Sequence, residues 1–314
     1  MLRQAVRDIF KADWEKHRAI SSLPCTVAIA TCLIAGVILR QPAGGLVAAS
    51  GAMSVGFGSF QRLGRSRVRP MLWAAIGMTV CTACGSFAGH SLLGLSLNAV
   101  ILGLLFGSMS AISGGTAWIS LQCAIFCIVA TGYPATPKLT GIRALLILAG
   151  GLLQLGFVSI LRRVHIGFAP SVPADAFPGY RSALRRVRKN VVNWTSEFRY
   201  ALRLALALLL ATVAAHVLAL SNYYWVPMTT LLVLRTDLHE TLTRGLARMA
   251  GTLVGAGLAT LLLSTLRPGA AMLIVLIVIF AWLCYSVVMV SYGALSASVT
   301  AYIACLLSLA GLPQ

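Results

Sequence analysis

Acidic residues are scarce in this sequence, with 7 Asp and Glu against 25 Lys and Arg in 314 residues. Charged residues of both signs make up 10% of the chain and hydrophobic residues 59%, whereas an ordinary soluble domain is roughly 25% charged. This composition excludes a soluble globular protein. The alternating segments of roughly ten residues that a membrane β-barrel requires are also missing. The composition therefore predicts a helical membrane protein.

Motifs of catalysis and cofactor binding are missing too. No nucleophile elbow or phosphate-binding loop occurs in a credible context. The closest cysteine spacings, Cys81-x-x-Cys84 and Cys123-x-x-x-Cys127, have no His or carboxylate to complete a metal site. We therefore expect no enzyme activity, no metal and no cofactor, and we interpret the cysteines as small packing residues.

Hydropathy predicts eleven membrane segments in two groups, separated by a polar stretch. The segments are 20–39, 43–60, 71–89, 92–111, 114–131 and 141–161, then 200–220, 222–235, 246–266, 269–290 and 291–310. GxxxG pairs that start at Gly85, Gly103 and Gly251 predict close helix packing. The fold class is an all-α polytopic membrane protein.

The two groups resemble each other, which predicts an internal repeat. Each has a Trp-containing charged segment before its first long span, then a short second span, a basic segment and a Gly-rich third span. Two parallel repeats of about six helices, 6 + 5 of them in this sequence, fit this pattern. The predicted divisions are 1–163 for the first repeat, 164–198 for a basic cytoplasmic linker and 199–314 for a second repeat that is expected to lack its last helix.

Most basic residues fall in three blocks, Arg3 to Arg18, Arg62 to Arg69 and Arg162 to Arg203. All three fall on one side of the predicted topology, which places the N-terminus in the cytoplasm. This location disfavours nucleic acid as a partner. The segment Arg181 to Arg203 is expected to lie at the membrane surface with its cations near anionic lipid.

The stretch YYWVPMTTLLVLRTDLHETLTRGLARMAGT, residues 223–252, is the best candidate for a functional site. Its outer end carries Tyr224 and Trp225, and Pro227 predicts an irregular backbone there. A short segment of this kind is typical of substrate sites in transporters. At the inner end, a set of charged residues shares one helical face with Gly251 and Gly255. These charged residues are Asp237, Glu240, Arg244 and Arg248, preceded by Arg235.

The first half has a matching set of cations, Arg62, Arg65 and Arg69. Together the two sets predict a cationic ring that favours an anion arriving from the cytoplasm. The alternative is that these arginines only fix the topology and bind lipid phosphate. No Asp or Glu lies in the middle of a predicted span, so His216 and Asp237 are the candidates for proton coupling. For His216, a packing or interhelical bond is the alternative.

The same stretch resembles the fusaric acid resistance-like (FUSC) family. The resemblance rests on the aromatic-Trp start, the short apolar span, the turn with Arg and acidic residues, and a closing element of Arg248, Met249, Ala250, Gly251, Thr252 and Gly255. It implies a multi-pass protein of the bacterial inner membrane that is related to exporters of aromatic carboxylic acids. It also implies a periplasmic adaptor as a candidate partner.

The leading hypothesis is an inner-membrane efflux transporter of organic anions, driven by the proton gradient. Arg244 and Arg248 would attract the anion, and Tyr224 and Trp225 would line or gate the outer end. The alternatives are a passive anion channel and a non-transporting scaffold that binds membrane lipid. Many Gly and Ala faces need partners, which makes a homo-oligomer a candidate assembly.

Overall fold

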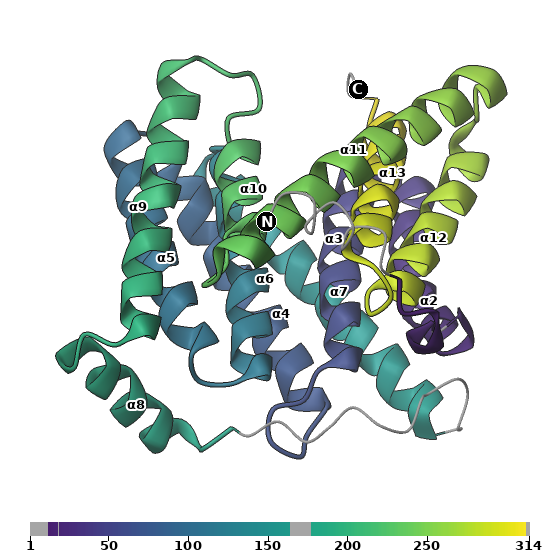
Figure 1. The fold of residues 1–314 in the computed structure, drawn as a ribbon. Helices are drawn as coiled ribbons and strands as arrows, with labels where there is room; N and C mark the ends of the chain where they lie inside the picture. The colour runs from purple at the N-terminus through teal and green to yellow at the C-terminus, as the bar shows by residue number, and fades with distance from the viewer. Residues whose placement is uncertain (1–11, 18, 164–176, 312–314) are drawn as a thin grey trace. The chain divides into compact units, whose positions relative to one another are not determined.

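The computed structural model describes residues 12–17, 19–163 and 177–311, and Figure 1 shows its helices. Ten of the described helices are long and apolar enough to cross a bilayer. This finding confirms the all-α polytopic fold class. The predicted basic residues Arg3, Arg7, Lys11 and Arg18 and the linker residues 164–176 lie outside the described ranges.

The helices follow one another with mostly short connections. Their bounds are α2 Ala19–Ile38, α3 Pro42–Gly56, α4 Val68–Ala88, α5 Leu92–Ser110, α6 Gly114–Thr131, α7 Pro137–Arg163, α8 Tyr180–Val192, α9 Ser196–Val217, α10 Trp225–Val233, α11 Leu238–Leu266, α12 Ala270–Val287 and α13 Tyr292–Leu309, with 3-10 helices η1 Trp14–Lys16 and η2 Phe57–Phe60. The predicted segment 222–235 contains only α10, which has 9 residues. This short helix explains why ten spans are found where eleven segments were predicted.

The chain forms two compact units, and each draws on both halves of the sequence. The first unit, which we call unit 1, contains the helices α2, α3, α11, α12 and α13 and the C-terminal part of α7. Unit 2 contains α4, α5, α6, α8, α9, α10 and the N-terminal part of α7. The chain passes between the units at 56–57 and 236–237, and within α7 at 152–153.

Both units pack their helices in the same order. In unit 1, α11 packs on α13, α12 packs on α13 and α2, and α2 packs on α3. In unit 2, α4 packs on α6, α5 packs on α6 and α9, and α9 packs on α10. Each unit therefore combines the first two helices of one half of the sequence with the third to fifth long helices of the other half.

Glycine pairs form the closest helix contacts in both units, as the GxxxG pattern predicts. A Cβ atom at Gly85 would overlap the backbone carbonyl of Cys127 on α6, and one at Gly103 would overlap the backbone of Ala205 on α9. These glycines let helix backbones approach each other, which is how helices associate in membranes without a hydrophobic driving force between them.

Polar side chains of α12 tie the helices of unit 1 together. Trp282 Nε1 donates to the carbonyl oxygen of Ala19 at 2.8 Å, and Tyr285 Oη donates to that of Met53 at 2.8 Å. Gln154 of α7 is fully buried in the same unit, and neither its amide nitrogen nor its amide oxygen has a hydrogen-bond partner in the part of the chain that the structure describes. A buried polar group without a partner is unusual, because roughly 90% or more of the buried polar groups in proteins are hydrogen-bonded.

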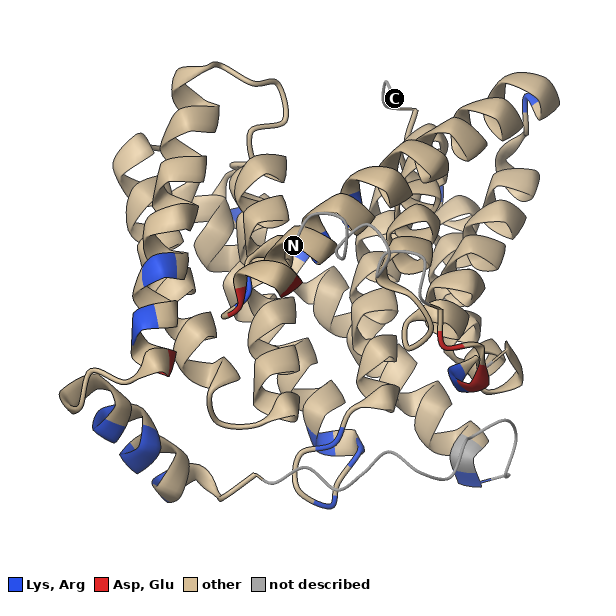
Figure 2. Ribbon diagram, viewed as in Figure 1, with Lys and Arg blue, Asp and Glu red and all other residues tan. Residues whose placement is uncertain are grey.

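Basic residues concentrate on a few segments of unit 2. Figure 2 shows them on α8, at the start of α9 and in the loop before α4. On α8, the cations lie beside exposed apolar side chains such as Tyr180 and Leu184. Arg186 connects α8 to the rest of unit 2, because it donates to the carbonyl oxygen of Ile112 at 3.2 Å.

Candidate functional site

The helix α10 is too short to cross a membrane. Its 9 residues extend about 14 Å at 1.5 Å per residue, less than half of the roughly 30 Å hydrocarbon core. Turns occupy 218–224 before it, and 234–236 after it are not helical. Because non-helical backbone at membrane depth must contact protein or water, α10 marks the place in unit 2 where polar groups have to gather.

The irregular backbone expected near Pro227 lies just before this residue. Pro227 itself is in the first turn of α10, where a helix tolerates a residue without an N–H group. The neighbouring amides donate to the preceding turn, in the pairs Trp225 to Asn222, Val226 to Tyr223 and Met228 to Tyr224. These amides are therefore not free to bind an anion, and a ligand here would have to use side chains.

Aromatic residues lock the turn before α10 in place. Tyr224 is buried, stacks on Trp225 with ring centroids 5.6 Å apart, and shares a 3.0 Å hydrogen bond with the hydroxyl of Tyr133. Burial and the hydrogen bond with Tyr133 raise the pKa of Tyr224 above its ordinary value, so this phenol stays protonated at neutral pH. Tyr223 donates to the carbonyl oxygen of Thr131. The gating role predicted for Tyr224 and Trp225 remains a prediction.

Two residues of this cluster were not predicted from the sequence. Arg143 of α7 donates to the carbonyl oxygen of Tyr133 at 2.7 Å, and its guanidinium carbon lies 5.9 Å from the centre of the Tyr133 ring. The available signal was a single Arg near the start of a long apolar run, which is often functional in membrane helices. Here the cation satisfies a carbonyl group just beyond the C-terminal end of α6.

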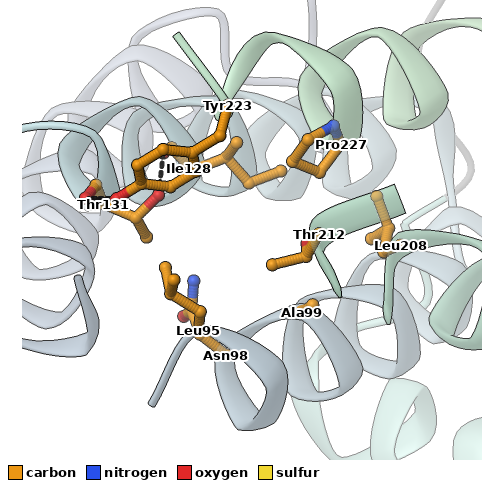
Figure 3. A pocket seen from close by; sticks show the side chains of 9 residues that line it. All are labelled: Leu95, Asn98, Ala99, Ile128, Thr131, Leu208, Thr212, Tyr223 and Pro227. Atoms are coloured by element: carbon orange, nitrogen blue, oxygen red, sulfur yellow. Dashed lines mark hydrogen bonds between the residues drawn. The ribbon is translucent and has the colours of Figure 1, made fainter. Parts of the chain in front are cut away.

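A small hollow lies beside this cluster, between α5, α6, α9 and α10 (Figure 3). Its empty space is about 280 Å³ including the open side, and it has room for about one water molecule. In the described state it is therefore too small for an aromatic ring. The lining residues are Leu95, Asn98, Ala99, Ile128, Thr131, Leu208, Thr212, Tyr223 and Pro227.

The other end of α10 is held by α9. Arg203 Nη2 donates to the carbonyl oxygen of Arg235 at 2.6 Å and to that of Thr236 at 3.0 Å. Tyr200 donates to the carbonyl oxygen of Leu234 at 3.1 Å. The sequence analysis assigned Arg203 to the lipid-facing basic block and did not predict this contact. Arg235, a predicted site residue, is half-buried next to these bonds.

In unit 1, the predicted charged face begins α11. Asp237 is the N-cap residue, and its carboxylate accepts from the backbone N–H of Glu240 at 3.0 Å. Glu240 and Arg244 form the predicted ion pair, with 3.1 Å between Oε1 and Nε. An N-cap of this kind stabilises a helix start by about 1 kcal/mol. This gives Asp237 a structural role, and its proposed role in proton coupling remains untested.

Of the predicted charged residues, Arg244 contacts the same helix as the glycine seam. The guanidinium carbon of Arg244 lies 5.0 Å from the centre of the Tyr292 ring on α13. Further along α11, a Cβ atom at Gly251 or Gly255 would overlap the backbone carbonyls of Gly293 or Ala297, also on α13. One face of α11 therefore carries both a cation and the helix contact. Arg248 is half-buried.

The cations predicted from the first half lie together in one turn of unit 2. Arg65 is exposed between η2 and α4 and Arg69 is exposed in the first turn of α4, whereas Arg62 is partly buried and its Nε has no hydrogen-bond partner among the described residues. Arg244 and Arg248 belong to unit 1, so the ring that would combine both sets remains a prediction. His216 lies exposed in the last turn of α9, with its ring 6.0 Å from that of Tyr223, rather than in the middle of a span.

The fold defines a multi-pass, all-α membrane protein. Residues 209–314 match the family model described as fusaric acid resistance protein-like, which confirms the resemblance over the C-terminal part of α9 and over α10 to α13. No curated protein and no solved structure matches the chain. The family match thus includes α10 and the charged start of α11, which the sequence analysis singled out.

Proposed function

We propose that this protein exports small organic anions across the bacterial inner membrane, with aromatic carboxylic acids as the substrate class. The observation that carries the proposal is α10, a helix of 9 residues between irregular segments in a chain of otherwise long apolar helices. Discontinuous helices form the substrate sites of many secondary transporters. The aromatic substrate class rests on the match of residues 209–314 to the fusaric acid resistance-like family.

The distribution of charge supports an anion as the transported species. The chain has a formal net charge of +18, and cations occur at the predicted cytoplasmic ends of α9, α10 and α11. Surface cations of this kind raise the local concentration of anions and disfavour cations. Arg235, Arg244 and Arg248 are therefore proposed to collect the anion, together with Arg62, Arg65 and Arg69.

The residues of the chain indicate the charge of the substrate more clearly than they indicate what drives its transport. Among the ten candidate spans, the carboxylates are Glu197 and Glu240, and each lies in the first turn of its helix. Proton carriers commonly have a carboxylate at membrane depth. Coupling through His216 or Asp237 is thus one proposal, and passive flow of the anion is the alternative that this distribution favours.

The matched packing of the two units supports the internal repeat as part of this proposal. Helices α2, α3, α11, α12 and α13 would correspond to α9, α10, α4, α5 and α6 in that order, because equivalent pairs make contact. Parallel repeats recur in transport proteins. The exchange of the first two helices would make each half of the chain necessary for both units.

Uptake into proteoliposomes tests the proposal. Purified protein is reconstituted, and the entry of labelled benzoate is followed with and without an imposed pH gradient, next to protein-free liposomes that report passive permeation. We expect faster uptake with protein and a further increase with the gradient. Equal rates in both liposome types would reject transport. Uptake that follows the anion gradient alone would identify a passive channel.

A further inference from the structure

The hollow beside α10 has an uncharged lining. None of its nine lining residues is Asp, Glu, Lys, Arg or His. Moving an ionised carboxylate out of water without a cation is strongly unfavourable. A group that enters this hollow should therefore be polar but uncharged.

The polar atoms of the lining have fixed roles. Asn98 Oδ1 accepts from the thiol of Cys127, with 3.1 Å between Oδ1 and Sγ. This bond orients the Asn98 amide, and Figure 3 shows its nitrogen pointing toward the hollow. The Tyr223 hydroxyl donates its hydrogen bond to the carbonyl oxygen of Thr131, which leaves its oxygen as an acceptor. The hollow thus presents a donor from α5 and an acceptor from the turn before α10.

We propose that this hollow binds the carboxyl group of the organic acid in its protonated, uncharged form. The carbonyl oxygen of the acid accepts from Asn98 Nδ2, and its O–H group donates to Tyr223 Oη. An ionised carboxylate has only acceptors and would leave the Tyr223 oxygen without a donor. The identity of the ligand as an organic acid rests on the proposed function.

The remaining walls suit the apolar part of such a molecule. Leu95, Ile128, Leu208 and Pro227 line the hollow, and the ring would contact these side chains. Because the described state has room for about one water molecule, a wall must move to admit the ring.

The binding of a neutral acid would also explain the scarcity of carboxylates at depth. Each molecule that crosses in this form carries one proton, so the protein needs no acidic residue to couple the two. The titratable groups around the hollow are few, and α5 contributes none. They are Tyr223 and Tyr224 before α10, Tyr133 after α6 through its bond with Tyr224, Cys127 on α6, Cys81 on α4, and Tyr200 and, through its contact with Tyr223, His216 on α9.

Calorimetric titration of the purified full-length chain in detergent tests the proposal. Benzoic acid and a more acidic ring-substituted benzoic acid are titrated over a range of pH. We expect the apparent affinity for total acid to fall about tenfold per pH unit above the pKa of each acid, so that the two profiles are displaced by the difference between the two pKa values. Profiles that coincide for both acids, or an affinity that rises with pH, would overturn the proposal.

Benzamide provides a probe that does not titrate. It has the same shape, with a carbonyl acceptor and an N–H donor, and we expect its own affinity, measured by competition with benzoic acid, to be the same at each pH. A failure of benzamide to compete at any pH would contradict binding through an uncharged donor and acceptor pair.

Substitutions then locate the site. Asn98→Leu should weaken benzoic acid binding about tenfold, as expected for one lost hydrogen bond in an enclosed site. Cys127 acts as a positioning residue, so Cys127→Ala should weaken binding about threefold and Cys127→Ser should restore it. Cys123→Ala, one turn earlier on α6, is the matched control and should leave affinity unchanged. Unaltered binding in Asn98→Leu and Cys127→Ala would reject the assignment of the site.

Transport measurements separate this inference from the proposed function. Binding with these properties but without uptake in proteoliposomes would reject export and support the neutral-acid site. Uptake with a pH profile that is the same for both acids would support export and reject the neutral-acid site.

Discussion

The guanidinium group of Arg203 and the backbone of Arg235 form one of the shortest polar contacts in unit 2, with 2.6 Å between Nη2 and the carbonyl oxygen. The carbonyl groups that follow a helix have no N–H partner within it. Here Tyr200 and Arg203 of α9 satisfy the carbonyl groups of Leu234, Arg235 and Thr236 in succession. The irregular backbone after α10 is therefore fixed by side chains of α9.

Replacing Arg203 should loosen this connection. We expect Arg203→Ala to lower the free energy of unfolding by about 1 kcal/mol, because the hydrogen bonds are charge-assisted but the side chain is exposed. Arg203→Lys should recover only part of it, since Lys lacks the planar fork of donors. Thermal unfolding in detergent measures the change. Arg199→Ala, one turn earlier and exposed, is the control, and an equal loss there would show a general effect of removing charge.

The sequence predicts the helices and the local part of the site because both depend on short-range patterns. Apolar runs of sufficient length define the spans, and residues three or four positions apart must share a helical face. The Glu240–Arg244 pair and the close helix packing at Gly251 followed from this spacing. The short α10 was likewise visible as an apolar run of insufficient length.

Contacts between distant segments could not be predicted in the same way. The bond from Tyr223 to Thr131 joins residues 92 positions apart, and the pairing of Arg203 with Arg235 joins residues 32 positions apart. Apolar periodicity does not specify which helix lies next to which. For the same reason, the sequence did not predict that α2 and α3 lie in one unit with α11, α12 and α13 while α9 and α10 lie in the other with α4, α5 and α6. A repeat in the sequence is equally consistent with the first two helices of each half packing within their own half.

The contact of α11 with α13 can be tested at its glycine seam. Gly251→Ala should destabilise the protein by about 1–3 kcal/mol, because the added methyl group meets backbone and cannot be accommodated by a rotamer change. Gly257→Ala on the same helix is the matched control. Nothing lies within 4 Å of its Cβ position, so it should be neutral or stabilise by up to about 1 kcal/mol. Thermal unfolding of both variants is the measurement. Equal melting temperatures would contradict close packing of α11 against α13 at Gly251.

The unpaired amide of Gln154 predicts a substitution that stabilises the protein. Gln154→Leu removes a fully buried polar group without hydrogen-bond partners and should raise the free energy of unfolding by about 1–3 kcal/mol. Gln154→Glu keeps the shape but introduces an acid that must be buried unpaired, so it should destabilise the protein at neutral pH. Melting temperatures that fall in both variants would indicate that the amide has a partner in the native protein.

Substitutions of the two residues that form the ion pair at the start of α11 distinguish the electrostatic role of Arg244 from its structural role. Glu240→Ala and Arg244→Ala break the same 3.1 Å pair, whose side chains are 48% and 31% exposed, so each should change stability by only about 0–1 kcal/mol. Their effects on transport should differ in sign. Arg244→Ala removes a cation and should slow benzoate uptake, whereas Glu240→Ala removes an anion and should leave uptake equal or faster.

Salt provides the last control for this pair. Because the Debye length falls from about 10 Å at 0.1 M to about 3 Å at 1 M, high salt should reduce the difference in uptake between wild type and Arg244→Ala. The measurement is the initial rate of benzoate entry into proteoliposomes at low and high salt, with Arg199→Ala as a second removal of one positive charge on another helix. Equal slowing in Glu240→Ala and Arg244→Ala would mean that the pair only holds α11 in place, and the anion entrance would then have to be sought at Arg235.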